Sequence, residues 1–438
     1  MAFLCRGPAY LARRSGNADN PGVHMKLLRN TMLVSLMFSF ACAPAIAQGP
    51  PPHLPAEALA DAPDTARAEF LKSNVVVDGP VSGGLSFRFP DAFYEGRLFL
   101  LGESHGSAAP QVLDLELLTH LNRRIGLVDY VAEVDPVQAL WLNRYLASGD
   151  EDQMDRVFDL WNGGSQWANV PFEDKLRGIR SLNRSLPDGR GITLHGIDAI
   201  QDWPLLIELL RGRGVDIDEE AMTAASSAAE RARIALDALR GSGLDMPALS
   251  STLQHQAEGL DREATIFRNY AELVGNGTLG DRPAYGLWGA AHVLQAPVHG
   301  KLRFAGQVAE SDLPTASKVR SIVVYALDSA VQFPVPLPQG VARVKFNEGN
   351  VDGPVVKLDG SATLRAASEP GRITVFGIDP EGSPYRHGQQ LVALKSSMDP
   401  GIVPSEGVPT TGYMQYVGVY RGSDWAEPRE GSGPIIGP

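Results

Sequence analysis

The sequence predicts an α/β fold with a mainly parallel central sheet flanked by helices, a long helical-hairpin insertion and a β-rich C-terminal part. First, apolar runs typical of buried strands alternate with segments of helical periodicity from about residue 98 to residue 326. Second, the stretch 205–280 is helical in pattern, rich in alanine and charged. Third, proline and glycine become frequent and helical periodicity ends from Gln332 onward.

Apolar runs of strand length are the expected members of the sheet. They are 98–101, 128–132, 192–197, 284–288 and 321–326. Helical spacing is expected at 110–123, 136–146, 151–160, 172–186 and from Pro204. Two long helices are expected at 217–240 and 249–274, separated by Gly241, Gly243 and Pro247. The later strand-like runs fit either a small β module or the end of the same sheet: 341–346, 373–376, 391–394 and 414–419.

The N-terminal region has the pattern of a secretory signal. A short basic start at Met25 precedes an apolar run from Met32 to Ala41, and Ala45-Ile46-Ala47 provides a small-x-small cleavage site. The apolar run is shorter than the roughly 20 residues that span a bilayer, so no stable membrane anchor is expected. We therefore predict a periplasmic or secreted protein cleaved near Ala47, whether translation begins at Met1 or Met25.

Four parts make up the expected domain plan. A presegment and signal peptide (1–47) precede a Pro/Ala-rich tether (48–63) and an α/β catalytic domain (64–332) that carries the insertion at 205–280. Residues 333–438 form the β-rich C-terminal region, which either stands apart or completes the same domain.

Charge and cysteine content narrow the function classes. Both cysteines, Cys5 and Cys42, lie in the part expected to be removed, which excludes disulfides and a thiol nucleophile from the mature chain. Removal of five basic and one acidic residue leaves 34 Lys and Arg against 50 Asp and Glu, a formal charge of −16. Because no basic run remains, we expect a small-molecule partner, and neither nucleic acid nor anionic lipid.

Ionisable side chains follow four of the predicted strands. Glu103 and His105 come after the first, Glu133 and Asp135 after the second, and the other two strands are followed by Asp198 and His292. The carboxyl ends of parallel strands meet at one edge, where such sheets bind ligands. These residues should therefore converge. A histidine can then take a proton from water while a carboxylate orients it, and a second histidine or an arginine can stabilise an oxyanion.

Structural roles remain open for the same residues taken singly. Glu133 can cap the helix that begins near Pro136, Asp198 can cap the helix at Pro204, and His292 can be a core histidine. His255 is interpreted as a solvated residue of a long polar helix, and the charged run Asp261-Arg262-Glu263 as a helix face linked by ion pairs. The sequence holds no Gly-x-Ser-x-Gly elbow and no phosphate-binding loop, which disfavours a serine hydrolase and a nucleotide site.

Five motifs in order resemble the erythromycin esterase-like family, within a wider group that includes haem-binding ChaN and the Tiki/TraB metalloproteases. They are LLGESHGS (100–107), YVAEVDPVQALWLNRYLASGD (130–150), LHGIDAIQDW (194–203), REATIFRNY (262–270) and YGLWGAAHVLQ (285–295). They cover roughly residues 95–330, and YMQYVGVYRG (413–422) resembles the family's closing strand. The sequence departs from the family pattern at two places. After the first motif, Ala108-Ala109-Pro110-Gln111 stands where the family often has a glutamate and a basic residue. The segment before His292 lacks the additional Asn or His that the family often has there.

The resemblance implies roles for individual residues. His105 would be the general base that activates water, with Glu133 as its partner and Glu103 orienting the site. His292 and Arg268 would polarise the carbonyl or hold the oxyanion. Substrate contacts are expected from Asp135, Asp198, Ser104 and Trp288.

Three functions remain open on this basis. The leading one is an exported hydrolase that cleaves an ester or lactone without a required cofactor. The second is a hydrolase or peptidase dependent on a divalent metal such as Zn or Mn, with Glu103, His105, Glu133 and His292 as ligands. The third is a haem- or ligand-binding envelope protein.

Overall fold

The computed structural model describes residues 51–187, 189–337 and 340–436. The predicted signal segment, its cleavage site and both cysteines lie outside these ranges. Within the described part of the chain, no helix is long and apolar enough to cross a membrane.

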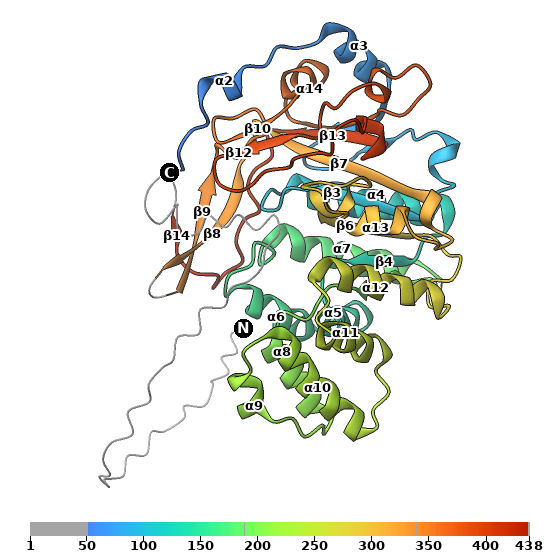
Figure 1. The fold of residues 1–438 in the computed structure, drawn as a ribbon, viewed down its shortest axis with the longest axis vertical. Helices are drawn as coiled ribbons and strands as arrows, with labels where there is room; N and C mark the ends of the chain where they lie inside the picture. The colour runs from blue at the N-terminus through green and yellow to red at the C-terminus, as the bar shows by residue number, and fades with distance from the viewer. Residues whose placement is uncertain (1–50, 188, 338–339, 437–438) are drawn as a thin grey trace, which may run out of the picture. The chain divides into compact units, whose positions relative to one another are not determined.

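A nine-stranded sheet forms the centre of the fold, in the order β2-β1-β11-β13-β7-β3-β6-β4-β5. Neighbouring strands from β13 to β5 pair in parallel, whereas β11, β1 and β2 pair antiparallel at one end. This arrangement confirms the predicted fold class (Figure 1). The strands are β1 (Val75–Pro80), β2 (Ser86–Phe87), β3 (Leu98–Glu103), β4 (Asp129–Ala132), β5 (Thr193–Gly196), β6 (Ala284–Gly289), β7 (Val319–Leu327), β11 (Arg372–Gly377) and β13 (Tyr416–Arg421).

Helices cover both faces of this sheet, because the central strands are apolar on both sides. Along β3 the alternation is plain: Phe99 and Leu101 belong to one core, Leu98 and Leu100 to the other. The first core is completed by α4 (Ala109–Ile125), α5 (Pro136–Ser148), α6 (Glu151–Trp161), α7 (Val170–Ser185) and α8 (Trp203–Gly212). The second is completed by α3 (Thr65–Ser73), α13 (Phe304–Ala309) and α14 (Ser361–Ala367).

The insertion differs from the prediction of two long helices, which is wrong. Four shorter ones occur instead: α9 (Glu219–Ala224), α10 (Ala228–Ser242), α11 (Pro247–Ala257) and α12 (Arg262–Gly275). Ser227 caps α10, and Gly259, with a φ of +84°, precedes the Asp261 cap of α12. These local signals interrupt the apolar periodicity, and they let α12 pack on the sheet through the second core.

The C-terminal region contributes to the main sheet, because β11 and β13 are two of its strands. It also forms a small sheet, in the order β14-β9-β8, from β8 (Val331–Leu337), β9 (Gly340–Phe346) and β14 (Ile435–Ile436). A further pair joins β10 (Val356–Leu358) to β12 (Leu394–Ser396). Both alternatives left open by the sequence are thus partly realised.

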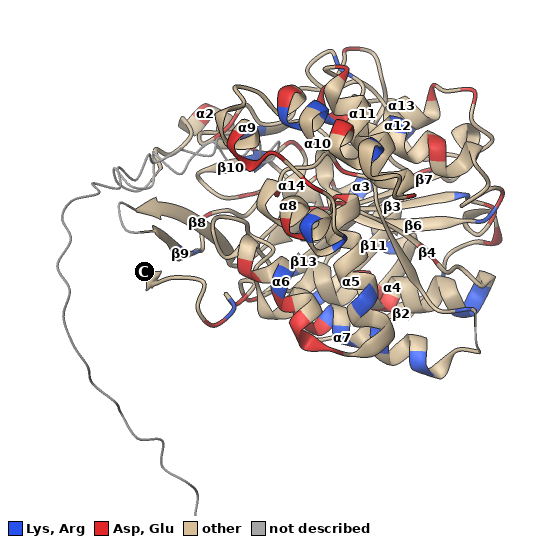
Figure 2. Ribbon diagram, turned by 90° about the horizontal axis from the view of Figure 1, so that it is seen from below, with Lys and Arg blue, Asp and Glu red and all other residues tan. Residues whose placement is uncertain are grey.

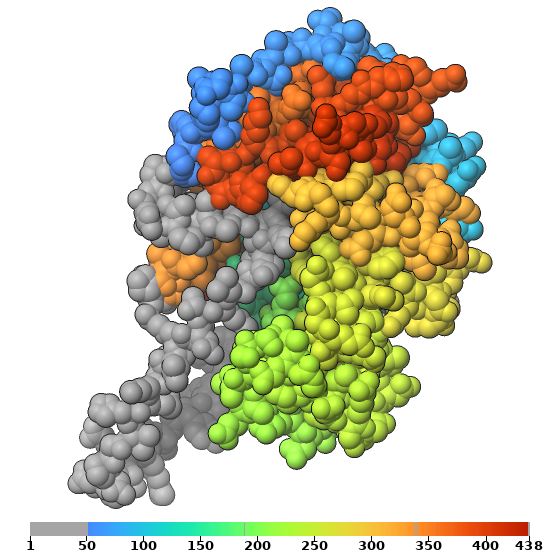
Figure 3. Space-filling model, viewed as in Figure 1, coloured from blue at the N-terminus to red at the C-terminus, as the bar shows by residue number. Residues whose placement is uncertain are grey.

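The described part of the predicted tether packs against the C-terminal region. It contains α2 (Ala56–Leu59), and the Asp61 carboxylate accepts hydrogen bonds from Ser361 Oγ and Ala362 N at 3.0 and 2.8 Å. In Figure 3 this blue segment lies directly against orange and red residues of the C-terminal region. On the helices α6, α7 and α8, basic and acidic residues are interspersed along the ribbon (Figure 2).

Candidate active site

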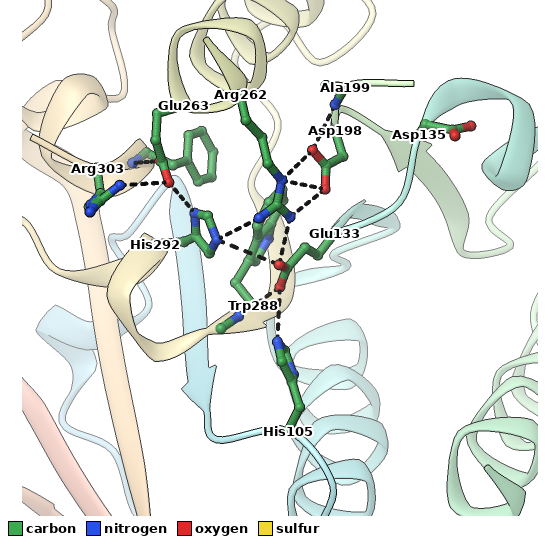
Figure 4. A network of polar contacts seen from close by, with 12 residues as sticks. His105, Glu133, Asp135, Asp198, Ala199, Arg262, Glu263, Trp288, His292 and Arg303 are labelled. Atoms are coloured by element: carbon green, nitrogen blue, oxygen red, sulfur yellow. Dashed lines mark hydrogen bonds and ion pairs between the residues drawn. The ribbon is translucent and has the colours of Figure 1, made fainter. Parts of the chain in front are cut away.

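Side chains from the ends of four neighbouring strands meet at the carboxyl edge of the sheet (Figure 4). His105 follows β3, His292 follows β6, and Glu133 and Asp198 follow β4 and β5. The register brings Glu103 opposite Gly289, so the β3 and β6 ends are level. Parallel pairing therefore places residues nearly two hundred positions apart in one cluster.

The first histidine is oriented by a buried carboxyl group. His105 Nδ1 lies 3.0 Å from Glu103 Oε1, which also accepts a hydrogen bond from Gln111 Nε2 at 3.2 Å. Burial raises the pKa of Glu103. Burial acts to lower the pKa of His105, but the Glu103 and Glu133 carboxylates outweigh it and raise that pKa above 6.5.

A second histidine–glutamate pair lies across the cluster. His292 is fully buried, and its Nδ1 lies 2.9 Å from Oε1 of Glu263, the second residue of α12. The other oxygen of Glu263 accepts a hydrogen bond from Phe304 N at 3.0 Å. Burial opposes ionisation of Glu263, but the charges of His292, Arg262 and Arg303 keep its pKa below the usual value. Each histidine thus turns Nδ1 toward a glutamate and Nε2 toward the centre.

Glu133 lies between the two Nε2 atoms. Its Oε2 is 4.0 Å from His105 Nε2 and accepts a hydrogen bond from Gly289 N at 2.7 Å. Its Oε1 is 3.5 Å from His292 Nε2. Burial alone would raise the pKa of Glu133, yet the surrounding positive groups lower it to about 2. This carboxylate therefore stays ionised wherever the protein is folded near neutral pH.

Arg262 joins these groups from the first turn of α12. Its Nη2 donates to Glu133 Oε1 at 2.9 Å and to Asp198 Oδ2 at 2.5 Å, and its Nε donates to Asp198 Oδ1 at 2.9 Å. Its Nη1 lies 3.3 Å from His292 Nε2. Burial would lower the pKa of Arg262, but the two carboxylates raise it, so a fixed positive charge lies at the centre.

Glycines make room for this arrangement. A side chain at Gly289 would place Cβ 3.2 Å from His105 Nε2 and 3.4 Å from His292 Cδ2. Gly106 has a φ of +99°, and a Cβ there would meet Gln332 O at 2.6 Å. The first glycine leaves the space between the histidines open, and the second lets the chain turn sharply after His105.

The structure does not bring every expected residue to the cluster. Arg268, expected at the oxyanion, is exposed and lines a surface pocket with His255 and Glu272. Arg268 lies six positions after Arg262. At 3.6 residues per turn, the two side chains therefore point from different faces of α12. The expected convergence of Arg268 is therefore wrong, and Arg262 is the arginine that reaches the histidines.

Two of the expected substrate contacts, Asp135 and Trp288, have other placements, whereas Ser104 lies next to His105. Asp135 caps α5 by accepting from Val137 N and Gln138 N, and Figure 4 shows it apart from the network. Burial and the nearby Asp202 charge raise its pKa. Trp288 is fully buried, and its indole donates to Val131 O at 3.0 Å. Ser104 is half-buried beside His105.

The sequence interpretation missed the place of Arg262 and Glu263 in the site, because it assigned both to a helix face linked by ion pairs. Their signal was present, since both lie in the first turn after the Asp261 cap, in one of the five motifs. His255 is also buried, with Nδ1 3.0 Å from Asn269 Oδ1, so its predicted solvation is wrong. Among the described residues, no group of three or more His, Cys, Asp or Glu is arranged to hold a metal ion.

Solved structures share this fold at low sequence identity. A crystal structure of a Bacillus cereus protein matches with a TM-score of 0.56 at 14% identity, covering 83% of this chain and 99% of that chain. A succinoglycan biosynthesis protein matches with a TM-score of 0.56 at 11% identity, covering 83% of this chain and 98% of that chain. A mutant of the erythromycin esterase EreC in its open conformation matches with a TM-score of 0.50 at 16% identity, covering 76% of this chain and 92% of that chain.

ChaN of Campylobacter jejuni matches with a TM-score of only 0.29, too low to support an argument. No family model and no curated protein matches the chain. At these identities the similarity to EreC and the other structures establishes the α/β fold alone.

Proposed function

We propose that this chain is a hydrolase that cleaves an ester or lactone with water activated by His105. The observation that carries this proposal is the pairing of two buried histidines around one ionised carboxylate. Each histidine has a glutamate at Nδ1. The Nε2 of His292 faces Arg262, whereas the Nε2 of His105 is left to exchange a proton in the space beside Gly289. The fold shared with an erythromycin esterase agrees with this class of reaction.

The proposed reaction follows from the positions of the charges. His105 Nε2 takes a proton from a water molecule while the water oxygen attacks the carbonyl carbon of the ester. Glu133 stabilises the imidazolium that forms. Arg262, whose Nη1 lies 3.3 Å from His292 Nε2, supplies positive charge to the oxyanion. When the ester C–O bond breaks, the imidazolium returns its proton to the departing alkoxide, which gives a carboxylic acid and an alcohol. Neither step calls for a cofactor.

A divalent metal site is the competing proposal from the same residues. Arg262 lies 2.9 Å from Glu133 Oε1 and 3.3 Å from His292 Nε2, so its positive charge would repel a cation between them. We expect the full hydrolytic rate to persist after dialysis against a chelator. Loss of activity that returns with added Zn or Mn would favour the metal-dependent reaction.

The direct test replaces His105 with alanine. Loss of a general base should lower kcat/KM for a simple ester about 10²- to 10⁴-fold, while circular dichroism and the thermal midpoint stay close to wild type. His195→Ala is a matched control, because His195 is a half-buried histidine whose Nε2 is 2.8 Å from Asp129, near the other edge of the sheet. Equal activity in the two variants would refute the role of His105.

Export, expected from residues 25–47, is part of the same proposal. It would put hydrolysis of a small-molecule ester in the periplasm or outside the cell. Fractionation of cells that express the full chain should recover the activity, with the N-terminus shortened to a residue near Gln48.

A further inference from the structure

The segment between α6 and α7 carries a tryptophan to the edge of the site. Its sequence, Asn162 to Asn169, is NGGSQWAN. The indole of Trp167 lies 5.2 Å from the His105 ring, centroid to centroid, at an interplanar angle of 71°. Trp167 is half-buried, so part of its surface remains accessible to solvent.

Trp167 is the last member of an aromatic row that leads out of the core. Its ring lies 6.0 Å from that of Trp161, which in turn lies 5.0 Å from Phe158 and 5.4 Å from Phe172. Phe158 and Trp161 are buried. The inner rings thus support Trp167 from behind, and Trp167 packs against the first core while part of it stays exposed.

Distant parts of the chain fix the backbone of this segment. The buried Arg343 of β9 donates from Nη1 to Ser165 O at 2.7 Å and from Nη2 to Asn162 O at 3.0 Å. Burial lowers the pKa of Arg343 to about 10. Burying a guanidinium among main-chain carbonyls costs free energy. In return, these hydrogen bonds join the segment to the small C-terminal sheet.

Two further contacts fix the residues next to Trp167. Gln166 Nε2 donates to Gln332 O at 2.6 Å, and Gln332 N donates to Gly106 O at 2.8 Å, so one strand holds both the segment and the turn after His105. Arg429 N donates to Ala168 O at 3.2 Å. Trp167 therefore has a fixed position relative to His105.

We infer that Trp167 forms the wall of a substrate subsite that takes a ring-bearing group of the ester. This inference rests on the proposed hydrolysis at His105. A rigid indole with an accessible surface stacks on flat apolar rings and gains less from flexible alkyl chains. Placed beside the base, it would bind the part of the substrate adjacent to the scissile bond.

The test compares binding of two amides, so that it does not depend on ester cleavage. N-benzylbutanamide carries a ring and N-pentylbutanamide a chain of similar size. We expect Trp167→Ala to raise the Kd of the benzyl amide about tenfold and to leave that of the pentyl amide within about twofold, measured by titration calorimetry or ligand-observed NMR. Trp167→Phe should recover most of the affinity.

Phe87→Ala serves as the matched control. Phe87 of β2 is also half-buried, and its ring stacks on that of His120 at 4.5 Å between centroids. It should leave both Kd values unchanged, because β2 lies at the other end of the strand order from the strands that carry the site. Equal weakening of both amides by Trp167→Ala, or no change in either, would overturn the subsite. If Trp167→Ala weakens binding of the benzyl amide but not of the pentyl amide, while benzyl butyrate is not hydrolysed, the subsite stands and the proposed esterase activity fails.

Discussion

Two clusters of similar residues lie near opposite edges of the same sheet. The site cluster comprises His105, Glu133, Asp198, Arg262 and His292. The distal cluster comprises Asp129, His195 and Arg282, near the amino ends of β4, β5 and β6. Each has a histidine, a carboxylate and an arginine, so residue types alone do not tell them apart.

Burial separates the two clusters. In the distal cluster, Arg282 donates to both oxygens of Asp129 at 2.7 and 3.0 Å, but its side chain is 53% exposed. In the site cluster, the Arg262 side chain is 15% exposed and His292 is fully buried. The distal pair joins a half-exposed arginine to a buried carboxylate, since the Asp129 side chain is only 3% exposed. The site cluster holds buried charges, whose desolvation costs stability. We therefore expect them to be kept for function.

The largest expected difference between the clusters is the effect of removing each arginine. Arg262→Met leaves Glu133 and Asp198 buried without their main partner and should lower the free energy of unfolding by roughly 3–5 kcal/mol. It should also lower kcat about 10²- to 10³-fold through loss of oxyanion stabilisation. Arg282→Met should cost less than Arg262→Met, because Arg282 is half exposed and His195 Nε2 remains 2.8 Å from the Asp129 carboxylate.

Urea unfolding measures the first quantity and ester hydrolysis the second. Arg262→Lys refines the result, since a lysine keeps the charge but cannot contact Asp198 and Glu133 with a planar fork. If Arg262→Met and Arg282→Met lose equal stability and both keep full activity, the distinction between the clusters is unfounded.

The position of the site was predicted from the sequence, but its arginine was missed. Apolar runs ended by Glu103, Glu133, Asp198 and His292 mark the carboxyl edge because strand direction follows from alternation with helices. Arg262 and Arg268 both lie on one helix, and choosing between them needs the rotation of α12 about its axis. That rotation is set by Ile266, Tyr270 and Val274, which pack against the sheet. Arg262 precedes them at the same four-residue spacing, a signal that the choice of Arg268 did not use.

The C-terminal region shows a second limit of the sequence. Its short strand-like runs predict β structure, but pairing partners far apart in the chain decide which sheet each strand joins. β13 enters the main sheet beside β7, whereas β8 and β9 pair with each other near the Trp167 segment. The region's contribution to the site through Gln332 and Arg343 therefore became visible only in three dimensions.

A smaller effect is expected from filling the space between the histidines. Gly289→Ala would put a methyl group 3.2 Å from His105 Nε2, where the attacking water is proposed to sit. We expect about a tenfold lower kcat/KM, because small displacements of reacting groups are costly, with little change in stability. Gly289 has a φ of −55°, so alanine introduces no backbone strain.

Gly275→Ala provides the control for this substitution. Gly275 ends α12 with open space around its would-be Cβ, so alanine there should raise helix stability by up to about 1 kcal/mol and leave hydrolysis unchanged. Full activity in Gly289→Ala would show that the gap beside His105 is not where water is activated.

The smallest expected effect is on the pH profile, where only the site cluster should matter. A histidine base is inactive when protonated, and the pKa of His105 is raised. Activity should therefore fall as pH decreases through an apparent value above 6.5, with log kcat/KM declining by one per pH unit. Glu133, with a pKa of about 2, should add no second limb between pH 3 and 6.

Asp129→Asn should leave this acid limb where it is, although it removes the partner of His195. The limb belongs to the coupled Glu103–His105 pair, so a variant far from that pair has no means of moving it. A limb below pH 6.5, or one that shifts in Asp129→Asn, would contradict the assignment of His105 as the base. His195 is also paired with a carboxylate, that of Asp129. An acid limb that is the same in wild type and Asp129→Asn would therefore show that this second histidine–carboxylate pair does not shape the pH profile.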